Sequence, residues 1–254
     1  MVEFQKERCF LIGDIHGDTV GFLEYLDEMK SFKDVTIENS DVVFLGDIGI
    51  GFYHYSYSIM DWRRNNDVAT MDVLEKWAEE NNNKIWVLRG NHDDPLLFSK
   101  RFFSRFKYID YLKDGETIKA KNGKTYLVVP GAISVDRKWR ELGLSYWDNE
   151  IVKENTYKRK KKQNFDGVFA HTGPTPPICE KSTFIKKMKN EDPALEKDIA
   201  EERRVVDFII DKFDVKSWYN GHYHINSDFI YREKCDVHAI DINTPFELYD
   251  DTIY

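Results

Sequence analysis

Polar residues carrying the ligand atoms that divalent metal ions prefer follow several short apolar runs of this sequence. They are Asp14 and His16, Asp47, Asn91 with His92 and Asp93, His171, and His222 with His224. Five of the seven histidines of the chain belong to this set. Each residue alone has an ordinary structural explanation, such as a turn-forming aspartate or a hydrogen-bonded core histidine. Their joint occurrence at the ends of apolar runs favours a shared role.

The spacing within this set allows side chains to converge. In extended backbone, residues i and i+2 point to the same side, so Asp14 with His16, and His222 with His224, can each direct two side chains into one cavity. Carboxylate, imidazole and amide oxygen ligands suit Mn²⁺, Fe²⁺ or Zn²⁺. Seven ligand candidates exceed the four of one tetrahedral ion, so the sequence predicts a catalytic centre for two ions that share one carboxylate.

The apolar runs before these residues have the length of buried strands. They cover residues 9–12, 42–45, 85–88, 168–170 and 218–219. Helices are predicted between them, from Asp18 onward with an apolar stripe that begins at Phe22, and over 68–80. Asp94-Pro95 and Asp192-Pro193 each predict an N-cap followed by proline at the first helical position, and the second helix should extend to about residue 213. This alternation favours a layered α/β fold.

The middle of the chain has a different pattern. Residues 108–112, 117–120 and 124–129 resemble a hairpin-rich patch with Asn122-Gly123 as a tight turn, and the last forty residues are also rich in β-forming residues. No repeat and no Gly/Ser/Pro-rich linker marks a boundary, so one domain over residues 1–254 is expected.

Bulk composition excludes several classes of protein. The formal net charge of -8 argues against a protein that coats a nucleic-acid backbone, so no stable nucleic-acid complex is expected. The three cysteines, Cys9, Cys179 and Cys235, show no C-x-x-C spacing and indicate neither a disulfide framework nor a thiolate zinc site. The N-terminus lacks a signal-peptide pattern, and no apolar run approaches the ~18 residues of a membrane span. A cytoplasmic protein without a membrane partner is expected.

The ordered motifs resemble the calcineurin-like metallophosphoesterase superfamily, in a bacterial or phage form. They are Gly-Asp-Ile-His-Gly at 13–17, Gly-Asp at 46–47, Gly-Asn-His-Asp at 90–93, His171, and Gly-His-Tyr-His at 221–224. The resemblance implies an α/β (α+β) fold in which two packed mixed β-sheets are flanked by helices, a four-layer sandwich with metals at the strand ends.

The resemblance also implies a role for each motif residue. One ion would be held by Asp14, His16 and His224, the other by Asn91, His171 and His222, with Asp47 bridging both. His92 matches the family's histidine beside the leaving group, and Asp93 matches the acidic residue after it, which makes these two the catalytic candidates. The cofactors would be two divalent ions, Mn²⁺ foremost, with Fe, Zn, Ni or Mg as alternatives.

A phosphoesterase mechanism follows from two such ions. Divalent ions ~3.5–4 Å apart lower the pKa of a bridging water and so supply hydroxide to attack a phosphomonoester or phosphodiester. His92, whose unperturbed pKa is near ~6.5, would protonate the leaving oxygen. A metal-dependent phosphoesterase is therefore the expected activity.

The sequence departs from protein Ser/Thr phosphatases after the second motif. Those enzymes continue Gly-Asp-x-x-Asp-Arg-Gly, whereas Ile50 and Gly51 occupy the Asp and Arg positions here. Arg89 is shared with that group, and Arg137 and Arg140 offer planar donors to phosphate oxygens, in a segment similar to one in bacterial and phage metallophosphoesterases. Ordinary surface salt bridges remain an alternative role for Arg137 and Arg140.

The substrate class stays open at this point. The aromatic residues Phe52, Tyr53, Tyr55, Tyr57 and Trp62 can form a stacking wall for a nucleobase, or can pack a loop against the core. The basic run 158–162 is either a solvated helix end or a contact for polyanions. A nucleotide, another phosphorylated small molecule or a phosphoprotein is the expected substrate. The alternatives are a protein Ser/Thr phosphatase and an inactive scaffold that keeps the fold.

Overall fold

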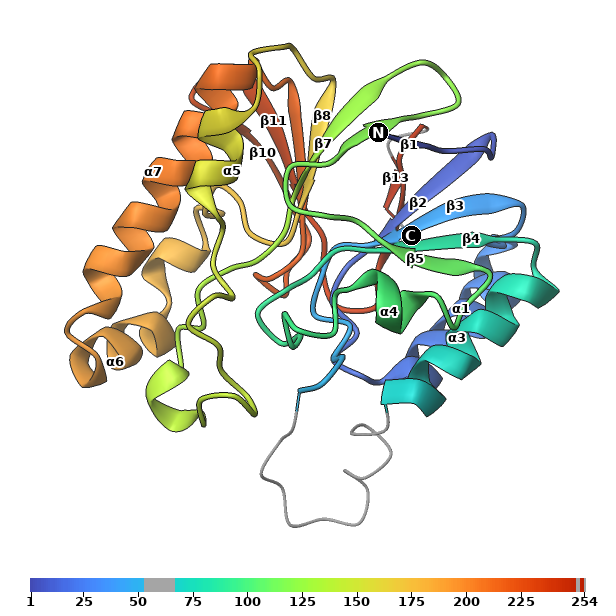
Figure 1. The fold of residues 1–254 in the computed structure, drawn as a ribbon, viewed down its shortest axis with the longest axis horizontal. Coiled ribbons are helices and arrows are strands. Elements are labelled where there is room, and N and C mark those ends of the chain that lie inside the picture. Colours follow the sequence, from blue (N-terminus) through green and yellow to red (C-terminus); the bar gives the residue numbers. More distant parts are fainter. Residues whose placement is uncertain (53–66, 250–251, 254) are drawn as a thin grey trace.

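The computed structural model describes residues 1–52, 67–249 and 252–253, which form two mixed β-sheets packed face to face. Helices cover the outer face of each sheet, so that the layers run helix, sheet, sheet, helix (Figure 1). The four-layer sandwich implied by the motif resemblance is therefore the observed architecture.

The first sheet contains the N-terminal ligand-bearing strands. Its order is β13 (Thr252–Ile253), β12 (Pro245–Glu247), β2 (Arg8–Ile12), β3 (Ser40–Phe44), β4 (Lys84–Val87) and β5 (Ile109–Tyr111). Strands β2 to β5 are parallel, whereas β12 runs antiparallel to β2 and β13. Because the parallel strands share a direction, the loops that follow β2, β3 and β4 lie at one edge of the sheet.

The second sheet contains the C-terminal ligand-bearing strands. Its order is β1 (Val2–Glu3), β6 (Thr117–Lys119), β7 (Thr125–Val129), β8 (Gly167–Ala170), β9 (Ser217–Asn220), β11 (Cys235–Ala239) and β10 (Ser227–Tyr231). Strands β7, β8, β9 and β11 are parallel, β6 and β7 form an antiparallel hairpin, and β10 pairs antiparallel with β11.

Alternating side chains divide the core into layers. In β2, Cys9 and Leu11 face the second sheet, whereas Phe10 and Ile12 face the helices, as the two-residue period of a strand requires. The inter-sheet layer also contains Val128 of β7 and is fully buried at these positions. This shared layer joins the two sheets rigidly and therefore fixes the distance between the loops at their ends.

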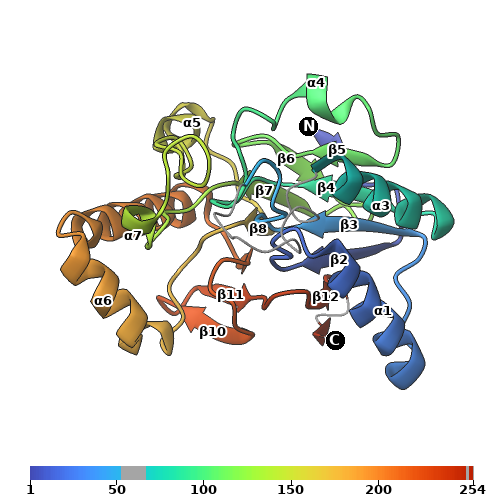
Figure 2. The ribbon, with the colours of Figure 1, turned by 90° about the horizontal axis from the view of Figure 1, so that it is seen from below.

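Helices occupy opposite sides of the molecule. α1 (Thr19–Lys33), α3 (Asp67–Glu80) and the short α4 (Lys100–Phe103) pack on the first sheet, while α5 (Glu154–Arg159) and α7 (Leu195–Phe213) pack on the second. α6 (Thr183–Glu191) lies beside α7, on the far side from α1 and α3 (Figure 2). Within the described residues, no helix has the length and apolar character needed to cross a membrane.

Most of the predicted elements are confirmed. The Asp18 side chain accepts a hydrogen bond from the N–H of Gly21 and caps α1. Helix α7 ends at Phe213 as predicted, but it begins at Leu195 with Ala194 as its N-cap, so the predicted N-cap at Asp192 is wrong; Asp192 accepts from the N–H of Ala194 before the helix. The basic run begins within the last turn of α5, where Lys158 pairs with Glu154 at 2.6 Å.

Two predicted elements are wrong. No helix begins at Pro95, because the Asp94 N–H donates to the carbonyl of Ile50 and its side chain accepts from Leu96 N–H, which makes a closed turn; the helix begins at Lys100. The strand expected in the hairpin patch at 108–112 is β5, which pairs in parallel with β4 of the other sheet.

Candidate metal centre and adjoining pocket

The predicted ligands meet where the loops of both sheets converge. Asp14 and His16 follow β2, Asp47 follows β3, Asn91 follows β4, His171 follows β8, and His222 and His224 follow β9. Three groups of side chains place one ligand atom each within 4.8 Å of one another: Asp14, His16 and His224; His16, Asp47 and His92; and Asp47, His171 and His222. The structure thus brings all seven sequence-predicted metal ligands to one centre.

The first group surrounds the Asp14 carboxylate. The Nε2 atoms of His16 and His224 lie 3.0 Å apart, and Oδ2 of Asp14 lies 3.0 Å from Nε2 of His224 and 3.6 Å from Nε2 of His16. Asp14 is held in place because its carboxylate accepts from the N–H of His222. Three ligand atoms that face one another at this distance are suited to holding a cation between them.

The group of Asp47, His171 and His222 is built around His171, which is fully buried. Its Nδ1 donates to the carbonyl of Leu45 at 2.8 Å, so Nε2 faces Oδ1 of Asn91 at 3.0 Å and Oδ1 of Asp47 at 3.2 Å. Burial disfavours the imidazolium, but the Asp47 carboxylate more than offsets this and raises the pKa of His171 to about 9. Two oxygens aimed at one ring nitrogen require a positive charge there, and a metal ion can take the place of the proton.

Asp47 is shared by two of the three groups, and one of these also shares His16 with the group around Asp14. It belongs to both the cluster with His16 and His92 and the cluster with His171 and His222, and it is 1% exposed. Burial opposes ionisation, but the nearby His171 and His92 outweigh it and hold the pKa of Asp47 well below its usual range. An ionised carboxylate that reaches ligands on both sides is the arrangement that a bridging ligand needs.

Backbone strain is concentrated at the same residues. His16, Asp47, His222 and His224 have φ angles of 47°, 50°, 68° and 53°, in the left-handed region that L-residues rarely occupy. Such conformations cost on the order of 1–2 kcal/mol per residue and persist where function requires them. Gly90 is required beside them, because a Cβ there would collide with Oδ1 of Asp47.

The donor set therefore fits two divalent ions. The Asn91 amide donates through Nδ2 to Oγ of Ser134, which leaves its oxygen for the centre. Burial and the neighbouring His171 lower the pKa of His222 to about 3, so this ring is neutral and free to act as a ligand. Neutral imidazoles, ionised carboxylates and an amide oxygen make up the donor types that Mn²⁺, Fe²⁺ and Zn²⁺ accept.

His92 lies between this centre and Arg140. Its Nε2 is 2.6 Å from Nη2 of Arg140 and 3.9 Å from Oδ2 of Asp47. Arginine can only donate, so Nε2 accepts and the ring is neutral in this arrangement. Burial first, and the Arg140 charge in addition, hold the pKa of His92 well below its usual value, against the pull of Asp47. The ring also stacks on Phe52, with centroids 4.3 Å apart.

The three candidate arginines all lie in the described part of the chain, and of these only Arg140 contacts His92 at the centre. It is fixed by Asp136 at 2.7 Å and by Oγ of Ser134 at 3.0 Å. Arg89 is buried and donates to the carbonyl of Glu150, and Arg137 is paired with acidic residues that precede and begin α7. The contacts of Arg89 and Arg137 are structural.

The Asp93 carboxylate belongs to none of the three groups of ligand atoms and is held by backbone N–H groups instead. It accepts from the N–H groups of Gly49 and Ile50 at 2.8 and 3.0 Å, and from that of Gly90 at 2.8 Å. Burial and the nearby Asp47 carboxylate raise the pKa of Asp93 to about 7. Asp93 therefore ties the loop that follows β3 to the loop that follows β4, and positions both ligands that these loops carry.

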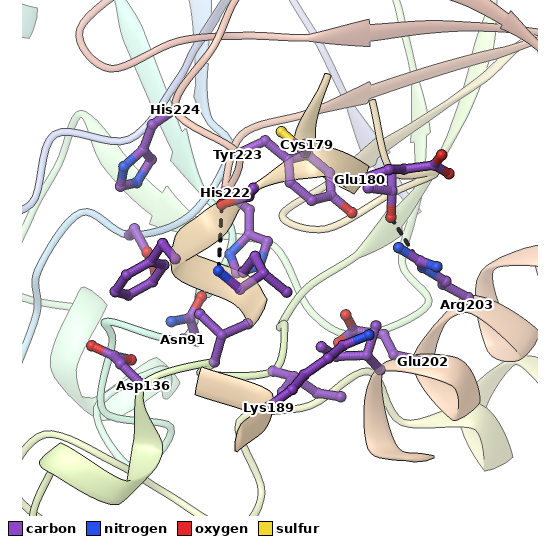
Figure 3. Close-up of a pocket in the computed structure, with 18 of the residues that line it drawn as sticks. Asn91, Asp136, Cys179, Glu180, Lys189, Glu202, Arg203, His222, Tyr223 and His224 are labelled. Carbon is purple, nitrogen blue, oxygen red and sulfur yellow. Dashed lines mark hydrogen bonds between the residues drawn. The ribbon is translucent and has the colours of Figure 1, made fainter. Parts of the chain in front are cut away.

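A pocket of about 720 Å³ opens from the centre toward α6 and α7 (Figure 3). Its walls include Asp47, Asn91, His92, Arg140, His222 and His224. The opposite wall includes Glu202 and Arg203 of α7, which no motif or spacing in the sequence separates from ordinary helix-surface residues. Of the aromatic residues considered above, Phe52 lies at His92, while Tyr53, Tyr55, Tyr57 and Trp62 fall outside the described residues.

The chain is similar to one protein family and to solved structures. The family profile for calcineurin-like phosphoesterases matches residues 8–226. One solved structure covers 98% of this chain and of its own at 13% identity, with a TM-score of 0.52. A dimetal phosphatase from Danio rerio covers 96% of this chain and 93% of its own at 10% identity, with a TM-score of 0.45. A search of curated proteins gave no match. The chain belongs to the calcineurin-like phosphoesterase family.

Proposed function

We propose that the protein is a dinuclear-metal phosphoesterase that hydrolyses phosphomonoesters or phosphodiesters of small molecules, with nucleotides as the first candidates. The observation that carries this proposal is the position of Asp47, which lies within ligand reach of groups on both of its sides. Asp14, His16 and His224 would hold one ion and Asn91, His171 and His222 the other. When bound, two divalent ions supply a water of lowered pKa as nucleophile and neutralise charge on the phosphoryl oxygens. Mn²⁺ is the first candidate for both positions.

The protein itself contributes orientation. Arg140 is held by Asp136 and Ser134 before any ligand arrives, so its guanidinium can bind a phosphoryl oxygen with little loss of side-chain entropy. His171 is kept in one orientation by the carbonyl of Leu45, and Asn91 by Ser134. Such supporting hydrogen bonds hold ligating side chains in the geometry that a metal requires.

His92 is proposed to transfer the proton to the leaving oxygen. A phosphate that binds to Arg140 competes for the hydrogen bond that Arg140 now donates to Nε2 of His92. The dianionic phosphate also favours the imidazolium and raises the pKa of His92, so that Nε2 can acquire a proton and donate it. Arg140 thus binds the phosphate first, and His92 then donates a proton to the leaving oxygen of the same ester.

The test combines metal loading with substitution of His92. The metal-loaded protein should hydrolyse at least one member of a panel of nitrophenyl phosphate, bis-nitrophenyl phosphate, nucleotides and a phosphopeptide. His92→Ala should keep its metal and lose about 10²- to 10⁴-fold in rate on an unactivated ester, with a smaller loss on nitrophenyl phosphate, whose leaving group needs no proton. His238→Ala, on β11 and outside the lining of the pocket, is the matched control.

Two results would contradict the proposal. Absence of hydrolysis of every ester by protein that holds two ions would indicate a scaffold that keeps the fold without the chemistry. An unchanged rate of His92→Ala on the unactivated ester would remove the proton-transfer role while leaving the metal centre in place.

A further inference from the structure

The pocket is larger than the reacting group requires. At about 720 Å³ it falls within the ~300–1,000 Å³ of sites that enclose a whole small molecule. Figure 3 shows Asn91, His222 and His224 on one side of it and Arg203 on the other. The space between them is available to the leaving group of the ester.

The part of the pocket beyond the metal ligands carries an apolar surface. Its apolar side chains come from the segment after β7 and from α6 and α7, and they are Ile133, Val135, Phe184, Ile185 and Ile199. Aliphatic and aromatic walls of this kind bind the carbon framework of a ligand, because burial of apolar area is favourable at ~25 cal/mol per Å². A leaving group with an apolar or planar body fits this wall.

Arg203 supplies a positive charge at the far wall. Its Nε donates to Oγ1 of Thr175 at 3.1 Å, and no carboxylate within the described part of the chain lies within 4.0 Å of its guanidinium. The next residue, Arg204, points elsewhere and pairs with both Glu154 and Glu201. Arg203 therefore retains a guanidinium whose charge can pair with an anionic group that enters the pocket.

Glu202 offers a second polar contact in the same wall. Its Oε2 accepts from Oγ1 of Thr172 at 3.3 Å, whereas Oε1 is buried without a hydrogen-bond partner among the described residues. Burial raises the pKa of Glu202 to about 7, which weakens its repulsion of an anion nearby. Beyond the metal ligands, two further carboxylates line the pocket: Asp136, which is paired with Arg140, and Glu180, which Figure 3 shows on the same side as Arg203.

We propose that the pocket is specific for phosphoesters whose leaving group carries a second anionic group, bound by Arg203, on an apolar body that packs against α6 and α7. This inference rests on the proposed phosphoesterase function and adds its substrate class. A nucleotide with a second phosphate and an aryl phosphate with a carboxylate both belong to that class. The free oxygen of Glu202 would accept from a hydroxyl or amine of the leaving group.

The test uses phosphonates, which bind like phosphoesters and are not hydrolysed. Calorimetry measures the affinity of the Mn²⁺-loaded protein for 4-carboxybenzylphosphonate and for a longer biphenyl homologue. Each acid is compared with its carboxylate methyl ester, which lacks the second charge. At least one acid should bind about tenfold more tightly than its ester, as a charge-assisted hydrogen bond provides. This preference should shrink in high salt, because Arg203 is exposed.

Arg203→Gln should reduce the preference for the acid to less than about threefold, and Arg204→Gln, the matched control on the same helix, should leave it intact. Equal binding of acid and ester by the wild type, or a preference that persists in Arg203→Gln, would overturn the inference. Hydrolysis of phenyl phosphate by the same preparation separates the two claims. If the ester is hydrolysed while acid and methyl ester bind equally, only the inference fails. If nothing binds and nothing is hydrolysed, both fail.

Discussion

Removal of the Asp93 carboxylate should destabilise the fold even before any metal binds. Asp93 is fully buried and accepts three backbone N–H groups, from Gly49, Ile50 and Gly90, at 2.8–3.0 Å. In Asp93→Ala all three donors lose their acceptor. In Asp93→Asn one oxygen can still accept from Gly49 and Ile50, but the amide NH₂ faces the N–H of Gly90.

The magnitude follows from these contacts. An unpaired buried donor costs ~1–3 kcal/mol, so three cost ~3–9 kcal/mol, and the cost of burying the ionised carboxylate, which the raised pKa of Asp93 reflects, offsets part of this loss. Because water can enter the space left by the side chain, Asp93→Ala should lower the free energy of unfolding by ~3–5 kcal/mol. Asp93→Asn, which loses one bond but also removes the buried charge, should lower it by less than Asp93→Ala does. The value for Asp93→Ala is large beside the ~5–15 kcal/mol of a typical domain.

The assay is denaturant unfolding of metal-free protein at pH 8.5, above the pKa of about 7 of Asp93, so that the carboxylate is ionised in the wild type. Asp94→Asn is the control, because the only hydrogen bond of the Asp94 side chain among the described residues is an exposed one from Leu96 N–H, and its loss should change stability by less than ~1 kcal/mol. If both Asp93 variants unfold within ~0.5 kcal/mol of the wild type, Asp93 does not anchor these loops, and the account of its role is wrong.

Three further substitutions test other parts of the structure. Burial raises the pKa of Glu150 from 4.5 to about 7, so the folded chain holds this proton more tightly than the unfolded chain, and Glu150 should contribute a fall of ~3 kcal/mol in the free energy of unfolding between those two pH values. In a pH series of denaturation curves, Glu150→Gln should reduce the total fall by this amount and leave the contributions of Asp93 and Glu202. Arg140→Ala should keep both metals and lower kcat/KM about 10- to 100-fold, because one charge-assisted bond to phosphate is lost; an unchanged value would exclude phosphate binding by Arg140. Tyr223→Phe loses the 2.7 Å hydrogen bond from the hydroxyl to the carbonyl of Gly173, which joins the two loops that carry His171 and His222. Its metal affinity, measured by competition with a chelator, should be about tenfold weaker, and an unaltered affinity would show that this bond is dispensable.

The metal ligands could be predicted from the sequence because local rules place them. Short apolar runs that end in glycine and a polar residue indicate strand ends, and parallel strands bring their ends to the same edge of a sheet. Asp14, Asp47 and His171 each follow such a run, and the structure gathers them as the spacing indicates. The helix cap at Asp18 was predictable for the same reason, since capping depends on residues within a few positions.

The roles of the arginines could not be predicted in this way. Arg137 and Arg140 lie three positions apart in one segment, yet Arg137 pairs with Asp192 and Asp198, which are 55 and 61 residues away, while Arg140 contacts His92, 48 residues away. Such contacts depend on how distant elements pack. The same holds for Arg203, whose place in the pocket follows from the docking of α7 against the second sheet.

The position of the Pro95 segment shows a conflict between local and distant interactions. Asp-Pro predicts the start of a helix, but the bond from Asp94 N–H to the carbonyl of Ile50 ties this segment to the loop after Asp47. The tertiary contact overrides the local preference and delays the helix until Lys100.

The central claim is that Asp47 bridges two metal ions, and metal stoichiometry tests it most directly. Protein loaded with Mn²⁺, passed through a desalting column and analysed by inductively coupled plasma mass spectrometry should contain two ions per chain. Asp47→Asn should lose both ions together, because its carboxylate is shared, whereas His92→Ala should retain two. A wild type with one ion or none, or an Asp47→Asn variant that keeps two tightly bound ions, would contradict the account.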